Sequence, residues 1–343
     1  MSSDAVNNRK IQHIEIIQSD KAVDRRKNYF DLIQLSHRAL PELNLADVDA
    51  SCTFMGKELS FPLLISSMTG GDHVVVETIN RNLALAAEAT QVAMGVGSQR
   101  VMFTNQEARK SFAIRAHAPT TLLFGNLGAV QLNYGFGIQH CREAIEVLEA
   151  DGLYLHLNPL QEAVQPEGDT NFSGLAEKIA AIVQTLEQPV ILKEVGSGFS
   201  EVDANRSIDM GIQYIDVAGA GGTSWSRIEH HRKGAPDDEI GLVYQDWGIP
   251  TPQALQQLAP YRNQLTLIAS GGLRSGLDML KSVILGARLC GLAAPFLQPA
   301  MESPEAVIQV IERLRREFRT GMFLLGCKNL EALETSPELI RSS

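Results

Sequence analysis

The sequence has few cysteines and no long apolar run. Its four cysteines, Cys52, Cys141, Cys290 and Cys327, include no C-x-x-C pair. This spacing excludes the usual zinc patterns and predicts reduced structural thiols. No apolar run approaches the ~20 residues that a membrane-spanning helix requires. Residues 1–18 are polar and lack the apolar stretch of a signal peptide, so we expect a cytoplasmic protein without a membrane partner.

Positive charge is also scarce. Lys and Arg number 30 and Asp and Glu number 40, which gives a formal net charge of −10 at pH 7. This acidic balance argues against nucleic acid and anionic membrane surfaces as partners. An anionic small ligand stays open, because a local cluster of cations can oppose the global charge. With 44% hydrophobic residues, the 343-residue chain can form a large core, as one α/β barrel or as two domains.

Eight short apolar runs recur along the chain, each ending in glycine or a small polar residue. They lack strict polar alternation, as is typical of parallel strands buried on both faces. Segments with apolar residues at helical spacing lie between them. This alternation predicts a single (β/α)8 TIM barrel, with residues 1–343 as one domain. The runs are 61–68, 91–97, 121–128, 152–158, 189–196, 214–221, 265–272 and 286–295; the helical segments are 77–90, 139–150, 174–186, 200–210, 251–259, 276–285 and 303–319.

Two segments depart from this repeat. Residues 1–60 precede the first run and form an N-terminal extension. Residues 223–248, which we call the flap, separate the sixth and seventh runs and contain both tryptophans, Trp225 and Trp247. A mobile flap over the site is the favoured interpretation, and a plain insertion is the alternative.

Polar and glycine-rich clusters follow the runs, where barrel active sites lie. Residues 270–272 (Ser-Gly-Gly) end the seventh run and Arg274 follows it, and Ala293 and Ala294 lie at the end of the eighth run. Loops at these two positions often bind phosphate through backbone N–H groups and a helix N-terminus. The alternative is an ordinary βα turn, which needs glycine as well. Together with a Gly-Gly-Thr sequence after the sixth run, the clusters favour phosphate.

Lys193 ends the fifth apolar run and must find an anion or a polar partner in the barrel mouth. One interpretation is a salt bridge with Glu194 or another acid. The other is a cation beside a flavin, where it stabilises the reduced, anionic ring. Asn126, Met68 and Thr69 lie at the ends of other runs and are placed to contact the same ring.

The most polar cluster is His156-x-Asn158-x-x-Gln161-Glu162. His156 and Asn158 have the same parity on a strand, so both are expected to face the barrel mouth. One carboxylate, Glu162, among amide neighbours suits Mg²⁺, which keeps several waters and uses ligand phosphates. The alternative is a polar loop with Glu162 in solvent.

Cations are placed to form a positive pocket despite the global charge. Arg9-Lys10-x-x-His13 alone is more typical of a solvated tail, whereas Arg100 follows a barrel strand. Together with Lys193 and Arg227, these cations suit a diphosphate.

In this order, the clusters resemble the type 2 isopentenyl-diphosphate delta-isomerases, which are FMN-dependent barrels. The match runs from residue 9 to about 295, and its most specific parts are Met68-Thr69-Gly70-Gly71 and the cluster 156–162. The remaining matches are Arg9-Lys10-x-x-His13, Gly97-Ser98-Gln99-Arg100, Gly125-Asn126-Leu127-Gly128, Gly168-Asp169 with Phe172, Lys193-Glu194-Val195-Gly196, Gly221-Gly222-Thr223 and Ser270-Gly271-Gly272-Leu273-Arg274.

The resemblance implies an isomerase of isoprenoid precursor biosynthesis that interconverts isopentenyl and dimethylallyl diphosphate. It implies FMN, active when reduced by NADPH, Mg²⁺ bridging to the diphosphate, and a homo-oligomer, a tetramer or larger. Our hypothesis is that reduced FMN is the acid/base and Lys193 tunes its charge.

The resemblance also implies a role for each site residue. The catalytic residues would be Gln161, Lys193, His156 and Asn158; the substrate-binding residues Arg9, Lys10, Ser98, Arg100 and Gln161; the metal ligand Glu162; and the FMN-binding residues Ser67, Met68, Thr69, Ser98, Asn126, Lys193, Thr223, Gly271, Gly272, Leu273, Arg274, Ala293 and Ala294.

Two other classes of function remain open, an FMN oxidoreductase of one of two kinds and a non-catalytic binding protein. An FMN oxidoreductase on the same barrel, such as a 2-hydroxy-acid oxidase-like enzyme, favours a catalytic histidine near the seventh run, and residues 265–274 contain none. An inosinate-dehydrogenase-like enzyme needs a cysteine in a strand-end loop, but Cys290 lies inside the eighth run and Cys52 precedes the first. A non-catalytic phosphate- or flavin-binding protein would not need Glu162.

Overall fold

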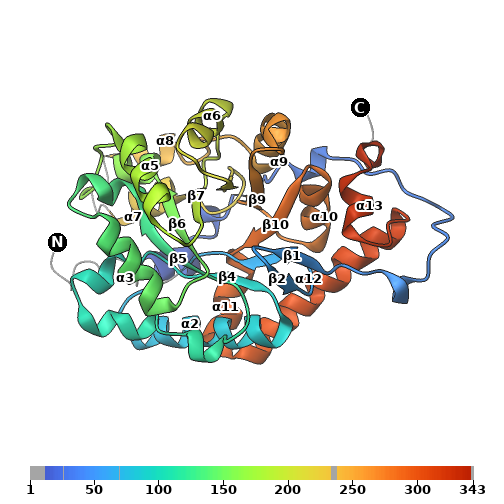
Figure 1. Cartoon of the computed structure of the whole chain (residues 1–343), viewed down its shortest axis with the longest axis horizontal. Helices are drawn as coiled ribbons and strands as arrows, with labels where there is room; N and C mark the ends of the chain where they lie inside the picture. The colour runs from blue at the N-terminus through green and yellow to red at the C-terminus, as the bar shows by residue number, and fades with distance from the viewer. Residues whose placement is uncertain (1–11, 26, 69, 233–237, 341–343) are drawn as a thin grey trace.

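Eight parallel strands close into a barrel at the centre of the molecule (Figure 1). The structure is a computed structural model that describes residues 12–25, 27–68, 70–232 and 238–340. Each barrel strand lies within one of the eight predicted runs, so the TIM barrel prediction is confirmed. In barrel order the strands are β10 (Ala287–Leu292), β3 (Leu63–Ile65), β4 (Ala93–Gly95), β5 (Leu123–Gly128), β6 (Gly152–Leu157), β7 (Val190–Glu194), β8 (Tyr214–Asp216) and β9 (Thr266–Ser270).

All seven predicted helices are present, and three of them begin at a serine cap. Ser200 and Ser275 cap two of them in capping boxes with Asp203 and Asp278, and Ser303 caps the last, which begins at proline. The predicted helices are α2 (Val74–Thr90), α3 (Ile138–Leu148), α5 (Leu175–Thr185), α6 (Glu201–Asp209), α9 (Thr251–Leu258), α10 (Gly276–Ile284) and α12 (Pro304–Leu324).

Further helices lie in the segments between these elements. Residues 12–19 are helical, and α2, α11 and α12 pack on one another along one side of the barrel (Figure 1). The link from β4 to β5 contains short 3-10 turns instead of an α-helix. The additional helices are α4 (Pro159–Val164), α7 (Trp225–Arg232), α8 (Ile240–Val243), α11 (Ala294–Glu302) and α13 (Leu330–Glu334). No helix in the described ranges is long and apolar enough to cross a membrane.

A small hairpin in the N-terminal extension closes the bottom of the barrel. Its strands are β1 (Cys52–Phe54) and β2 (Lys57–Leu59), which pair antiparallel across a turn at Met55 and Gly56. Phe54 and Leu59 are buried in a cluster formed by side chains of the barrel interior. Each such burial contributes about 1.5–3 kcal/mol. The sequence predicts no element in this part of the extension.

The described part of the flap contains two short helices and is packed against the rest of the molecule. It contains α7 and α8, and Ser226, Ile228 and Glu229 on α7 are fully buried. Arg25 of the extension donates hydrogen bonds to the carbonyl oxygens of Gln245 at 2.7 Å and Gly196 at 2.8 Å. The extension therefore ties the flap to the loop after β7. Motion of the flap stays a prediction.

Candidate active site

The cavity at the C-terminal ends of the strands, which we call the site cavity, encloses about 1620 Å³ of space, part of it open to solvent. Arg227, expected to add positive charge, does not line it, because its guanidinium is bound to Asp20 and Gln245. Arg9, Lys10 and Thr69 lie outside the described residues. All other predicted site residues line this one cavity: Ser67, Met68, Ser98, Arg100, Asn126, His156, Asn158, Gln161, Glu162, Lys193, Thr223, Gly271, Gly272, Leu273, Arg274, Ala293 and Ala294.

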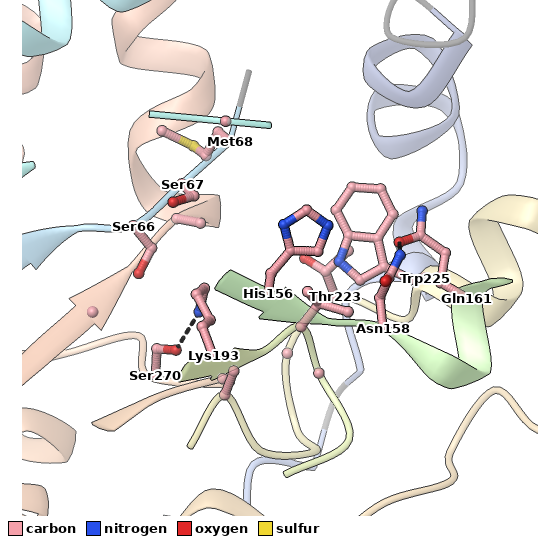
Figure 2. Close-up of a pocket in the computed structure, with 18 of the residues that line it drawn as sticks. Ser66, Ser67, Met68, His156, Asn158, Gln161, Lys193, Thr223, Trp225 and Ser270 are labelled. Atoms are coloured by element: carbon pink, nitrogen blue, oxygen red, sulfur yellow. Dashed lines mark hydrogen bonds between the residues drawn. The ribbon is translucent and has the colours of Figure 1, made fainter. Parts of the chain in front are cut away.

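Lys193 is paired with an acid, which confirms the first interpretation of the sequence. It also lines the site cavity, and its role beside a flavin stays a prediction. The acid is Asp216, the register partner of Lys193 on the neighbouring strand. The Lys193 ammonium donates to Asp216 Oδ2 at 2.9 Å and to Ser270 Oγ at 3.1 Å. Figure 2 shows Lys193 beside Ser270 at the floor of the cavity.

Glu194 is not the partner of Lys193. Its Oε2 accepts N–H bonds from Val195 and Gly196, both at 2.6 Å, and from Ser197. Burial raises the pKa of Glu194 to about 7, although the three N–H donors act in the opposite direction. Glu194 therefore holds the loop after β7 in shape, while Lys193 faces the barrel interior.

His156 and Asn126 are held in fixed orientations by adjacent strands. The Asn126 amide nitrogen donates to the carbonyl oxygen of Val96 at 3.1 Å, so its Oδ1 faces His156 Nδ1 at 2.7 Å. A neutral His156 therefore carries its proton on Nδ1. The parity argument is confirmed, because both His156 and Asn158 line the cavity.

Gln161 is held between an amide and a carboxylate. Asn158 Nδ2 donates to Gln161 Oε1 at 3.1 Å, and Gln161 Nε2 donates to Glu229 Oε1 at 2.8 Å. Burial acts to raise the pKa of Glu229, but the His13 hydrogen bond, together with Arg232 and Gln161, lowers it to about 2. An ionised carboxylate thus lies directly behind Gln161.

The wall beside Gln161 joins the extension to the flap. His13 lies 3.2 Å from Glu229 and packs edge-on against Trp225, with ring centroids 5.2 Å apart. His13 is buried, so this part of the N-terminal cluster is not a solvated tail. In Figure 2, Trp225, Gln161 and Asn158 stand on one side of the cavity, and Ser66, Ser67 and Met68 on the other.

Glu162 is buried, so the alternative of a polar loop with Glu162 in solvent is wrong, and the metal-ligand role of Glu162 stays a prediction. Its side chain accepts hydrogen bonds from Asn158 Nδ2 at 2.9 Å, from the Asp169 N–H at 2.7 Å and from Gln165. Asp169 also binds Arg100 at 2.8 Å. The described part of the chain contains no group of three or more metal-ligating side chains. A Mg²⁺ at Glu162 would therefore need phosphate oxygens and water as its other ligands.

The glycine-rich loops after β8 and β9 lie in close contact. Gly271 and Gly272 have φ of 92° and 84°, and a Cβ on Gly271 would lie 2.1 Å from the carbonyl oxygen of Gly219. Beside them, α11 begins at Ala294 with its N-terminus at the cavity. Backbone N–H groups and a helix N-terminus suit a phosphate. Arg274 is paired here with Asp24 of the extension.

The polar lining fits FMN. The Ser66 and Ser67 hydroxyls are buried and have no hydrogen-bond partner among the described residues. Leaving a buried hydroxyl unsatisfied costs about 1–3 kcal/mol, so a polar ligand at these groups is favoured. Donors and a cation at one end and the phosphate-type loops at the other match a flavin ring with a phosphate tail.

Sequence comparisons identify the family. A model described as FMN-dependent dehydrogenase matches residues 6–120 and 141–341. The isopentenyl-diphosphate delta-isomerase of Paracoccus zeaxanthinifaciens is 56% identical over 98% of this chain and 97% of its own. The chain belongs to the type 2, FMN-dependent isopentenyl-diphosphate delta-isomerase family. The isomerase of the same name from Hydrogenovibrio crunogenus is 55% identical over 99% of both chains.

Solved structures place this isomerase-family chain on a fold shared with oxidoreductases. A flavocytochrome b2 with sulfite bound has a TM-score of 0.70 at 19% identity, covering 96% of this chain and 82% of that one. At this identity the likeness shows the fold alone. The strand of the seventh run, β9, ends at Ser270 and is followed by two glycines. The histidine expected there for a hydroxy-acid oxidoreductase is absent. Burial raises the pKa of Cys52 to about 12 and that of Cys290 well above its usual value, so neither is a ready thiolate.

Two site residues of this family member were missed in the sequence. Asp216 had a detectable signal, because an acid inside a buried strand run needs an opposite charge, and Lys193 is a cation in another such run. Glu229 had none, since it lies on a polar helix of the flap, 68 residues from Gln161.

Proposed function

We propose that the protein is an isomerase that interconverts isopentenyl and dimethylallyl diphosphate, in isoprenoid precursor biosynthesis. The observation that carries this proposal is that Lys193, Gln161, Arg100 and Glu162 line one cavity. Behind this lining, Asp216 binds Lys193 and Glu229 binds Gln161. When bound and reduced, FMN supplies an electron-rich ring and the acid/base group beside the reacting carbons.

The residues around Gln161 suit a cationic intermediate. Moving a double bond needs a proton added at one carbon and removed at another, and positive charge develops between these steps. The ionised Glu229 behind Gln161, which is also ion-paired with Arg232, places a carboxylate near that region without offering a nucleophile to it. Trp225 forms an aromatic wall that excludes water and attracts positive charge.

At the other end, Arg100 and Ser98 bind the diphosphate together with Arg9 and Lys10, and Glu162 binds Mg²⁺. Glu162 is preset for this by Asn158 and Gln165, which orient its carboxylate. NADPH acts as the reductant. Residues 1–343 form one domain, the flap closes over the substrate, and the chain acts in the cytoplasm as a homo-oligomer, a tetramer or larger.

The test is anaerobic incubation of the purified protein with isopentenyl diphosphate, FMN, Mg²⁺ and NADPH in D₂O, followed by NMR. We expect dimethylallyl diphosphate and deuterium incorporation only when the flavin is reduced. Bound FMN with neither product nor exchange would contradict the proposal. Matched incubations with a 2-hydroxy acid would then test the oxidoreductase function.

A further inference from the structure

Asp216 is a fully buried carboxylate with no part in the chemistry described above. It lies at the end of β8, 0% exposed, and is not among the residues that line the site cavity. An isolated buried carboxylate is strongly disfavoured in a protein interior. Asp216 is stabilised by Lys193, by Ser270 and by the Ala218 N–H at 3.3 Å.

Lys193, Asp216 and Ser270 form a closed hydrogen-bonded ring. Lys193 donates to Asp216 Oδ2 and to Ser270 Oγ, and Ser270 Oγ donates to Asp216 Oδ1 at 2.5 Å. A lysine ammonium has three N–H donors. Two are used inside the ring, so the third is left for the site cavity that Lys193 lines. The ring thus sets where Lys193 points.

The ring also sets the charge that the cavity experiences. Asp216 lies within 2.9 Å of the ammonium and offsets most of its positive potential in a buried region. Tyr154, whose ring lies 5.8 Å from Lys193 Nζ, adds no negative charge, because burial and Asp216 raise the pKa of its hydroxyl well above the usual value. The ligand therefore receives a directed hydrogen bond from Lys193, while the net charge of the Lys193–Asp216 pair is close to zero.

We propose that Asp216 is a positioning residue that aims Lys193 at the flavin ring and limits the positive charge there. This inference rests on the proposed function for the identity of the ligand, FMN. Limiting the positive charge matters because a full positive charge favours the anionic reduced flavin over its neutral forms. By limiting the positive charge, Asp216 therefore prevents the anionic form of reduced FMN from becoming too stable to exchange a proton.

The test is the midpoint potential of FMN bound to the intact protein, measured by dye equilibration with enzymatic reduction. Asp216→Asn keeps the shape and removes the counter-charge. We expect the reduction equilibrium to shift tenfold or more toward reduced FMN, about 30 mV for a two-electron couple, with a more anionic spectrum of the reduced flavin. Turnover should fall with little change in the KM for the diphosphate, which binds at the other end of the cavity.

Two further variants separate charge from structure. Lys193→Met combined with Asp216→Asn removes both charges. In this double variant the reduction equilibrium of bound FMN should return to within twofold of the wild-type value. Asp151→Asn removes a carboxylate that binds Lys57 and Arg115, away from the site cavity, and should leave the potential unchanged. Thermal melting and FMN stoichiometry report on folding for each variant.

The outcomes are distinguishable from failure of the proposed function. If the wild type binds FMN and forms product but Asp216→Asn shifts the equilibrium less than twofold, or toward oxidised FMN, this inference is wrong and the function stands. A double variant that keeps the raised potential also overturns it. If the wild type binds no FMN, the proposed function fails first.

Discussion

The side chain of Gln161 donates a hydrogen bond to Glu229 at 2.8 Å across 68 residues of sequence. Gln161 lies on α4 at the mouth of the barrel, whereas Glu229 lies on α7 of the flap. The flap thus supplies a carboxylate behind the site as well as Trp225 in its lining. The packing of α4 against α7 fixes this relationship.

Glu229→Gln should lower kcat by about a hundredfold, the usual scale for loss of one preorganised electrostatic group. The substitution keeps the shape and removes the charge that faces the developing cation. FMN affinity should stay within twofold, since Glu229 does not line the cavity. Turnover by NMR and FMN titration are the measurements. Glu143→Gln, which removes a carboxylate bound to Arg109 outside the cavity lining, is the control. Equal kcat values for wild type and Glu229→Gln would refute the electrostatic role.

The same substitution predicts a pH dependence of stability. The pKa of Glu229 is lowered from 4.5 to about 2 in the folded protein. The ionised Glu229 therefore adds to the free energy of unfolding above pH 4.5, and this contribution is lost as the pH falls toward 2. From the linkage relation, the contribution is about 3 kcal/mol. The difference in unfolding free energy between wild type and Glu229→Gln, from urea titrations, should be largest above pH 5 and shrink below pH 4. A difference that does not change with pH would count against the ionised form.

Gly271→Ala should reduce both FMN occupancy and stability. Its φ of 92° is unfavourable for alanine, and the new Cβ would lie 2.1 Å from the carbonyl oxygen of Gly219. The cost is at least about 1–3 kcal/mol. Gly135→Ala is the matched control, because Gly135 has φ of 93° but no atom within 4 Å of the added Cβ. Flavin absorbance and thermal melting measure the two effects; similar losses in both variants would show that backbone strain alone is responsible.

Trp225 should report substrate binding and Trp247 should not. Trp225 lines the site cavity, whereas Trp247 is 63% exposed and lies outside it. Adding isopentenyl diphosphate to the reduced complex should change tryptophan fluorescence in wild type and in Trp247→Phe. The change should disappear in Trp225→Phe. A change that follows Trp247 instead would place flap motion away from the cavity.

Glu162→Gln should raise the Mg²⁺ concentration needed for half-maximal turnover by tenfold or more, on the scale of losing a ligand or its support. The amide keeps the hydrogen bond to the Asp169 N–H but not the charge. A magnesium titration of activity at fixed diphosphate measures this. An unchanged requirement would mean that the metal is bound by the substrate alone.

Much of the architecture was readable from local sequence. The eight strands were found because parallel strands buried on both faces form short continuous apolar runs, and α6, α10 and α12 carry serine caps. The hairpin at Cys52–Leu59 was not found, because its two short strands are stabilised by distant barrel side chains and not by a pattern of their own.

By itself, the sequence determined the barrel, the end at which the site lies and the chemical types of the lining residues. These follow from periodicity and from the rule that parallel strands present their carboxyl ends together. Only the tertiary structure decided the partners: Asp216 for Lys193, Glu229 for Gln161, and Asp20 for Arg227. Such pairs depend on strand register and on where the extension and the flap pack, which are set by contacts between residues far apart in the chain.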